Sequence, residues 1–126
     1  MEHILIIDDD PAIRNVFTQL LESKNYSVET AGEGKEGLTR MRERMPDLII
    51  TDIMMPEMDG LELVQTIRQL SPNLPVIAIS GGMQSAAINF LPLAEKFGAC
   101  KVFEKPVGLA KLASAVEELL SNAAKG

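Results

Sequence analysis

The chain has 126 residues, of which 46% are hydrophobic and 24% charged, and its formal net charge at pH 7 is −6. This length and composition predict one globular domain with one core, and the charge leaves no basic footprint for direct nucleic-acid binding. A single cysteine, Cys100, and a single histidine, His3, exclude an internal disulfide and a thiolate or histidine metal site. The sequence has no long apolar stretch and no signal peptide, so we expect a soluble cytoplasmic protein without a membrane partner.

The first predicted elements are a strand and the helix that follows it. The apolar run HILII predicts a strand at about residues 3–7. Asp10 is a natural N-cap for the next helix, and Pro11 suits its first position. The helix has one apolar stripe at the spacing i, i+3, i+4, i+7 and i+8, formed by Ile13, Val16, Phe17, Leu20 and Leu21.

Two further strand–helix pairs follow. Strands are predicted at about residues 27–31 and 47–51, where SVETA and DLIIT stand. Apolar residues at helical spacing mark a helix after each strand, namely Leu38, Met41 and Met45 for the first and Leu61, Val64, Ile67 and Leu70 for the second.

The last part of the chain predicts two more pairs. Strands are expected at about residues 75–80 and 100–104. AAINFLPLAEKFG predicts the fourth helix, with Pro92 best placed in a first turn after an irregular start. The last helix is marked by Leu112, Val116, Leu119 and Leu120.

Five strand–helix units in strict alternation predict a doubly wound α/β domain, a five-stranded parallel sheet with helices on both faces. Ligands of such sheets bind at the carboxyl ends of the strands. Polar residues follow four of the five predicted strands, namely Asp8, Asp9, Asp52, Ser80 and Lys105. We therefore expect these five side chains to converge on one edge of the sheet.

The acids of this set favour a metal site. Each polar residue alone could be a cap, a loop residue or a surface charge, but caps do not explain Asp8 or Asp9, and Asp52 stands between apolar runs. Converging carboxylates become favourable around Mg²⁺, which prefers oxygen ligands. A phosphate-binding loop of the flavodoxin or Rossmann kind needs N–H donors, whereas DDDP would repel phosphate unless a cation lay between.

A cation, a carboxylate, a hydroxyl and an ammonium around one point predict phosphoryl transfer. Asp52 can attack phosphorus, Mg²⁺ can neutralise the transferring group, and Ser80 and Lys105 can hold its remaining oxygens. The expected product is an aspartyl phosphate.

Four sequence blocks, IIDDDP, TDIMMPEMDG, VIAISG and FEKP, resemble in order and spacing the signature blocks of the receiver domain of bacterial two-component response regulators. The resemblance covers the chain from the first strand to the last helix. It implies a CheY-like, flavodoxin-like (βα)5 fold, with a receiver domain over residues 1–122. Residues 123–126 are then a C-terminal tail or the start of a linker, and Met1 directly before the first strand indicates that the receiver begins its chain.

The resemblance implies a ligand set for Mg²⁺. Asp9 and Asp52 would ligate the ion directly, and the backbone carbonyl of Met54 would be a third protein ligand. Asp8 would act through a metal-bound water. Asp10 matches no functional position and stays the N-cap.

The resemblance also implies roles around the phosphoryl group. Asp52 would be the phosphoacceptor, and Ser80 and Lys105 would contact the phosphoryl group. The peptide bond before Pro106 is expected to be cis, which only X–Pro bonds adopt at modest cost. Gly60 would give the loop after Asp52 its tight turn.

The chain departs from the receiver pattern at two places. Receivers usually carry Tyr or Phe three residues before the lysine, where this chain has Val102; strand alternation directs the adjacent Phe103 to the opposite face. The stretch from Ser80 to Gly98 is longer than in compact chemotaxis-type receivers, and Gly81–Gly82 adds backbone freedom there.

The expected function is a phosphorylation-controlled switch that catalyses only its own phosphorylation and autodephosphorylation. A sensor histidine kinase or a histidine phosphotransfer protein would be the partner at Asp52. The modified surface of the fourth helix, fifth strand and fifth helix would bind a downstream protein target, and a phosphorylation-dependent dimer is compatible with this function.

Three alternatives stay open. A phosphorelay intermediate would pass the phosphoryl group to a histidine phosphotransfer protein. A haloacid-dehalogenase-type phosphatase has a second acid two residues after its nucleophile, where this chain has Met54. A degenerate receiver that only binds partners would not need the complete set of acids, hydroxyl and lysine.

Overall fold

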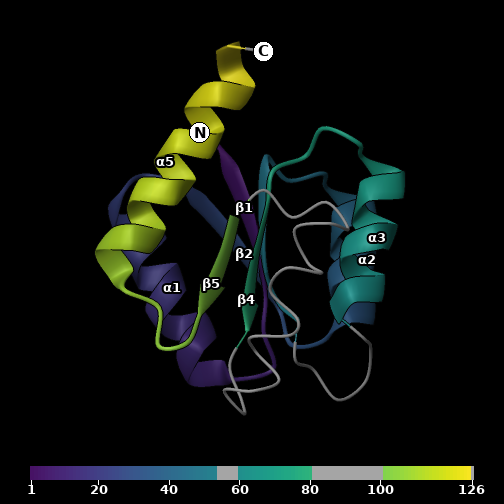
Figure 1. Cartoon of the computed structure of the whole chain (residues 1–126), viewed down its shortest axis with the longest axis horizontal. Coiled ribbons are helices and arrows are strands. Elements are labelled where there is room, and N and C mark those ends of the chain that lie inside the picture. Colours follow the sequence, from purple (N-terminus) through teal and green to yellow (C-terminus); the bar gives the residue numbers. More distant parts are fainter. Residues whose placement is uncertain (54–59, 81–100, 126) are drawn as a thin grey trace.

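A single sheet of five parallel strands forms the centre of the computed structural model, which describes residues 1–53, 60–80 and 101–125 (Figure 1). The strand order is β2-β1-β3-β4-β5. The strands are β1 (His3–Ile7), β2 (Ser27–Ala31), β3 (Leu48–Asp52), β4 (Val76–Ser80) and β5 (Lys101–Glu104). Each strand begins within one residue of its predicted position.

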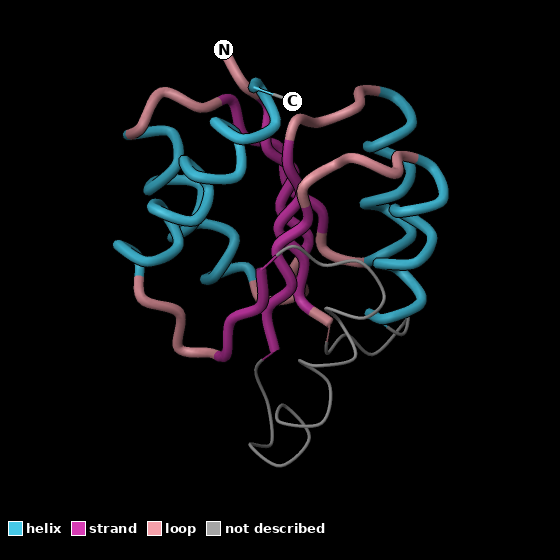
Figure 2. Tube along the Cα trace, turned by 45° about the horizontal axis from the view of Figure 1, so that its top comes forward, coloured by secondary structure: helices cyan, strands magenta, loops and turns pink. Residues whose placement is uncertain are grey.

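Helices cover both faces of the sheet. Helices α1 (Pro11–Ser23) and α5 (Leu109–Lys125) pack on one face, and α2 (Gly34–Glu43) and α3 (Gly60–Leu70) on the other (Figures 1 and 2). Strands β1, β3 and β4 are buried along their whole length, which explains why they read as continuous apolar runs rather than alternating ones. The predicted doubly wound α/β fold is confirmed.

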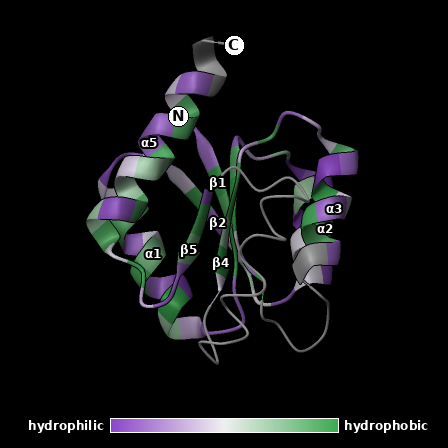
Figure 3. Cartoon of the chain, viewed as in Figure 1, coloured by the Kyte–Doolittle hydropathy of each residue, from purple (hydrophilic) through white to green (hydrophobic). Residues whose placement is uncertain are grey.

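The sheet separates two apolar clusters. One contains residues of α2 and α3, with Val102 packed against it, and the other contains residues of α1 and α5, with Phe103 packed against it. Hydrophobic residues run along the central strands, whereas each helix carries both hydrophobic and hydrophilic residues (Figure 3). The opposite placement of Val102 and Phe103 confirms the alternation predicted for β5.

The start of α1 has the predicted cap. Asp10 is in extended backbone, its side chain accepts a hydrogen bond of 2.9 Å from the Ala12 N–H, and Pro11 is the first helical residue. The predicted apolar stripe lies along α1, but its burial is uneven, because Phe17 and Leu21 are buried whereas Val16 is 43% exposed. Val16 lies instead in an apolar groove of about 440 Å³ that Leu109 also lines.

The end of α2 also differs from the prediction. The helix ends at Glu43, so Met45 lies beyond it and is 51% exposed. Arg44 already has extended backbone, and Met45 precedes Pro46, whose ring disfavours helical backbone in the residue before it.

Some predictions fall outside the described residues, namely the fourth helix with Pro92, the Gly81–Gly82 pair and the carbonyl of Met54. The proposed boundary at residue 122 falls within α5, which continues through Lys125, and the division into domain and tail stays a prediction. Within the described ranges, no helix is long and apolar enough to cross a membrane.

Candidate functional site

Strand register brings the predicted acids to one level of the sheet. Ile7 of β1 is paired with Thr51 of β3, so the residues that follow them, Asp8 and Asp52, leave the sheet side by side. Both carboxylates are buried, with residue exposures of 2% and 3%, whereas Asp9 is exposed. The parallel topology therefore places two buried acids at the carboxyl edge, where the sequence predicts a site.

Lys105 joins these two acids. Its Nζ lies 3.1 Å from Asp8 Oδ2 and 3.0 Å from Asp52 Oδ2. The Lys105 backbone N–H donates to the Ser80 carbonyl at 2.8 Å, which fixes the start of the lysine side chain at the end of β4. The ammonium thus compensates two carboxylates whose burial without a partner would be costly.

The pKa values of Asp8 and Lys105 follow from this arrangement. Burial raises the pKa of the Asp8 carboxyl above its ordinary value, although the Asp10 N–H, which donates to Asp8 Oδ1 at 2.9 Å, and the Lys105 ammonium both lower it. Burial alone would lower the pKa of Lys105, but hydrogen bonds to the two carboxylates and their charges raise it. Burial dominates at Asp8, and the two anions dominate at the more exposed lysine.

The donor set fits a hard cation. Carboxylate oxygens of Asp8, Asp9 and Asp52 lie within 4.8 Å of one another, which is close enough to share one ion. Mg²⁺ prefers oxygen ligands and keeps several of its waters, so a few carboxylates at an open edge suit it. Asp10 is not part of this cluster, because its side chain caps α1.

Ser80 contributes a buried hydroxyl. The residue is 0% exposed, and its Oγ has no hydrogen-bond partner among the described residues. Leaving a buried hydroxyl unsatisfied costs roughly 1–3 kcal/mol, and such a group at the end of β4 is available to bond an incoming oxygen.

The remaining predicted residues are placed as follows. The Lys105–Pro106 peptide bond is cis, as expected. Gly60 is the first residue of α3. The carbonyl of Met54 lies outside the described residues, and its role stays a prediction.

Sequence reasoning missed Arg14, whose Nη1 donates to the Asp8 carbonyl oxygen at 2.7 Å. The sequence did contain a signal for this residue. Arg14 lies in the first turn of α1, where the helix dipole disfavours a cation, and a basic residue there suggests a specific partner.

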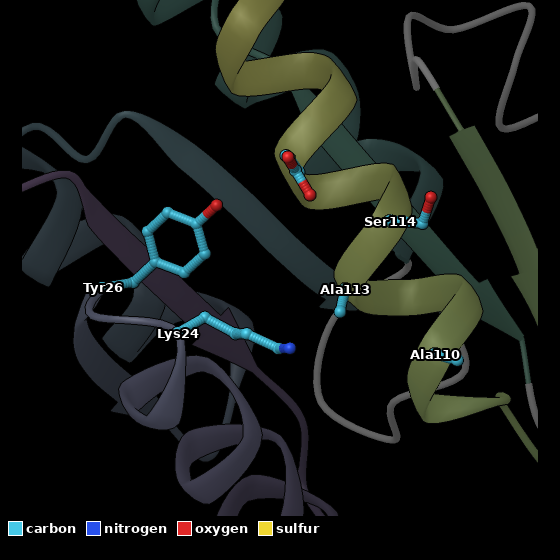
Figure 4. A pocket seen from close by; sticks show the side chains of 6 residues that line it. Lys24, Tyr26, Ala110, Ala113 and Ser114 are labelled. Carbon is cyan, nitrogen blue, oxygen red and sulfur yellow. The ribbon is translucent and has the colours of Figure 1, made fainter.

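A hollow of about 480 Å³ lies away from this site, where Lys24 and Tyr26 face α5 (Figure 4). Its lining residues are Lys24, Tyr26, Ala110, Ala113, Ser114 and Glu117, and none of them belongs to the acid cluster.

Comparisons with known proteins agree with the geometry. The family model described as the response regulator receiver domain matches residues 4–117. The response regulator receiver protein CpdR of Brucella abortus is 33% identical over 120 residues, which cover 95% of this chain and 98% of that protein.

Other relatives are longer proteins. The DNA-binding transcriptional regulator NtrC of Azospirillum brasilense is 38% identical over 119 residues, and the sensor kinase CckA of Brucella abortus is 35% identical over 119 residues. This chain spans only 24% and 12% of their respective lengths.

Solved structures show the same architecture. The CheY-like receiver domain protein of Methanospirillum hungatei JF-1 superimposes with a TM-score of 0.89 at 31% identity, covering 99% of this chain and 98% of that one. The receiver domain of NtrX from Brucella abortus gives a TM-score of 0.85 at 31% identity, covering 94% and 98%.

Proposed function

Because this chain belongs to the response regulator receiver domain family, we propose that Asp52 is its phosphoacceptor and that a sensor histidine kinase supplies the phosphoryl group. A receiver domain has a phosphoacceptor role in two-component signalling and is not a classical enzyme. The proposal assigns this role to one carboxylate and limits catalysis to the chain's own phosphorylation and its reversal.

One observation carries the assignment to Asp52. Its carboxylate is buried beside the Lys105 ammonium, with Nζ to Oδ2 at 3.0 Å. The Ser80 hydroxyl, which has no hydrogen-bond partner among the described residues, lies at the end of the adjacent strand β4. Asp9 is exposed, and Asp8, although it shares the Lys105 ammonium, lies in the loop after β1 rather than in a strand. Among the acids of the edge, Asp52 is the one on the central strand β3, between the other site residues of β1 and β4.

The reaction proceeds by attack of an Asp52 oxygen on phosphorus. The new O–P bond forms as the P–N bond of the donor phosphohistidine breaks, and the electron pair returns to the imidazole nitrogen, which takes up a proton. Lys105 stabilises the negative charge of the transferring group, and the Ser80 hydroxyl donates to one of its oxygens. Both groups are held by the sheet before the donor arrives, so little reorganisation is needed.

We assign Mg²⁺ to the acid cluster. Asp9 and Asp52 would hold it directly, the Met54 carbonyl would be the third protein ligand, and Asp8 would act through water. When bound, the ion neutralises charge on the phosphoryl oxygens and on the crowded acids. The cluster of three carboxylates supports this assignment.

The output surface would be formed by β5 and α5 together with the predicted fourth helix, which falls outside the described residues. This surface would bind a downstream protein, with a phosphorylation-dependent dimer as one form of output. A phosphorelay intermediate is the second candidate, and one observation favours it. Val102 stands where receivers usually carry an aromatic ring, and Phe103 packs on the other face of the sheet. A relay needs no conformational output, so the lack of this ring would cost it nothing.

Intact-mass spectrometry tests the assignment. Acetyl phosphate with Mg²⁺ should add one phosphoryl group, labile to hydroxylamine, and Asp52→Asn should abolish it because an amide is a poor nucleophile. Asp47→Asn is a matched control, because Asp47 lies before β3 at the opposite edge, where its carboxylate accepts from the His3 N–H. An adduct that persists in Asp52→Asn, or that forms equally in EDTA, would contradict the proposal.

A further inference from the structure

Arg14 makes a single short contact with the acidic loop. Its Nη1 donates to the carbonyl oxygen of Asp8 at 2.7 Å. This carbonyl belongs to the peptide unit between Asp8 and Asp9, so the hydrogen bond acts on the piece of backbone from which both carboxylates project. The start of this loop is also held, because the N–H of Asp8 itself donates to the Ala31 carbonyl at 3.1 Å.

The guanidinium of Arg14 is also confined on its far side. A Cβ built on Gly32 would lie 3.4 Å from Nη1 and 3.8 Å from Cζ, so the guanidinium packs against the Gly32 backbone. Gly32 is itself anchored, because its N–H donates to Glu36 Oε1 at 2.7 Å. Arg14 therefore lies between the loop after β1 and the loop after β2, with little room to leave the Asp8 carbonyl.

Two physical effects of Arg14 on a cation at the acid cluster have opposite signs. As a positive charge close to the site, Arg14 would repel Mg²⁺ and weaken its binding. As a donor that fixes the Asp8–Asp9 peptide unit, it would strengthen binding, because the carboxylates would need less ordering when the ion arrives. Arg14 is partly exposed, so solvent screens the first effect, whereas a hydrogen bond does not depend on long-range charge.

We propose that Arg14 is a positioning residue for the acid cluster, which pre-orders the carboxylates of Asp8 and Asp9 toward Asp52. This inference rests on the proposed Mg²⁺-dependent phosphorylation. Arg14 does not touch the ion or the phosphoryl group; it acts only through the backbone of the acidic loop.

The test is a Mg²⁺ titration of the whole chain, followed by backbone amide shifts, in wild type, Arg14→Ala and Arg14→Lys. Arg14→Ala should weaken Mg²⁺ binding by about 10-fold, the lower end of the loss expected when an outer partner of a metal ligand is removed. Arg14→Lys keeps the charge but not the planar donor and should give an intermediate loss. Arg42→Ala is the matched control, because Arg42 is an exposed arginine in the last turn of α2 and should leave the affinity unchanged.

A second readout needs no metal. In metal-free Arg14→Ala, the Asp10 amide should exchange its hydrogen faster, because its acceptor is Asp8 Oδ1 on the released loop, while the midpoint of urea unfolding changes little. Faster exchange throughout the chain would indicate a merely structural role and overturn the proposal.

The outcomes separate this inference from the proposed function. If wild type does not bind Mg²⁺, the proposed function fails and the inference fails with it. If wild type binds normally and Arg14→Ala binds equally well or more tightly, Arg14 acts only as a charge or not at all, and the inference alone is overturned.

Discussion

Lys105 and Asp52 are 53 residues apart in the sequence, yet Nζ of one lies 3.0 Å from Oδ2 of the other, and the same ammonium lies 3.1 Å from Asp8. A single cation thus balances two buried anions. The fold depends on this lysine for charge compensation as well as for any chemistry.

Replacing Lys105 should destabilise the metal-free chain. Lys105→Met removes the ammonium that bridges two buried carboxylates and should lower the free energy of unfolding by roughly 1–3 kcal/mol, less than for a fully buried pair because the lysine side chain is 22% exposed. Urea unfolding at neutral pH measures this. Lys101→Met is the control, because its pair with Glu118 is exposed on both sides and should contribute less than about 1 kcal/mol. Equal losses in the two variants would contradict the assigned role of the buried pair.

Asp8→Asn should stabilise the metal-free chain in a pH-dependent way. The fold raises the pKa of Asp8 above its ordinary value of 3.8, so the folded chain binds this proton more tightly than the unfolded chain. Wild type therefore loses stability as the pH rises from 3.8 through the folded pKa, and Asp8→Asn does not. The advantage of the variant should be present at neutral pH and vanish toward pH 3.8, as measured by urea unfolding across that range. If the stability advantage of Asp8→Asn were larger in acid than at neutral pH, the raised pKa of Asp8 would be contradicted.

Ser80→Ala should separate stability from reactivity. The Ser80 hydroxyl is buried and has no hydrogen-bond partner in the part of the chain that the structure describes, so its removal should leave the metal-free fold as stable or more stable, by up to about 1 kcal/mol. The same change should slow phosphorylation by acetyl phosphate by about 10-fold or more, because one donor to the phosphoryl oxygens is lost.

Thr51→Val is the contrasting control for Ser80. The Thr51 hydroxyl is buried and donates to the Asp52 carbonyl at 3.2 Å, so its removal should cost about 1 kcal/mol of stability. If Ser80→Ala destabilises the fold as much as Thr51→Val does, the Ser80 hydroxyl has a partner in the resting state.

Gly37→Ala should be among the more damaging small substitutions. A Cβ at Gly37 would clash with Cδ1 of Ile7 and lie 2.8 Å from its Cγ1, so α2 could not approach β1 as closely. The expected loss is roughly 1–3 kcal/mol. Ile7→Val removes Cδ1, so in a double-mutant cycle the combined loss should be smaller than the sum of the two single losses. Simple additivity would show that the two residues do not meet.

Local rules predicted most of this fold from the sequence. The Asp10–Pro11 pair set the start of α1, and strand alternation separated Val102 from Phe103, because caps and alternation depend on neighbours in the chain. The end of α2 was missed because the apolar spacing of Met45 was given more weight than Pro46 directly after it. Periodicity predicted the apolar stripe of α1 but not that Val16 would be exposed, because spacing shows that a helix has an apolar face but not how far the next helix covers it.

In the candidate site, too, some features were predictable from the sequence and others were not. Parallel topology gathers Asp8, Asp52 and Lys105 at one edge, so their convergence followed from the order of elements. A basic residue in the first turn of α1 was a signal for Arg14, but its partner, the Asp8 carbonyl, depends on how α1 packs against the loop after β1, which no spacing in the sequence encodes.

The order of the strands also determines when the site becomes complete. During synthesis, the acids of β1 and β3 emerge long before Lys105, which follows the edge strand β5. A chain that ends before residue 105 has two acids facing each other without their ammonium. The two buried carboxylates therefore gain the ammonium of Lys105 only when β5 has packed against β4. A nascent or truncated chain without Lys105 would accept a phosphoryl group less readily than a chain that contains it.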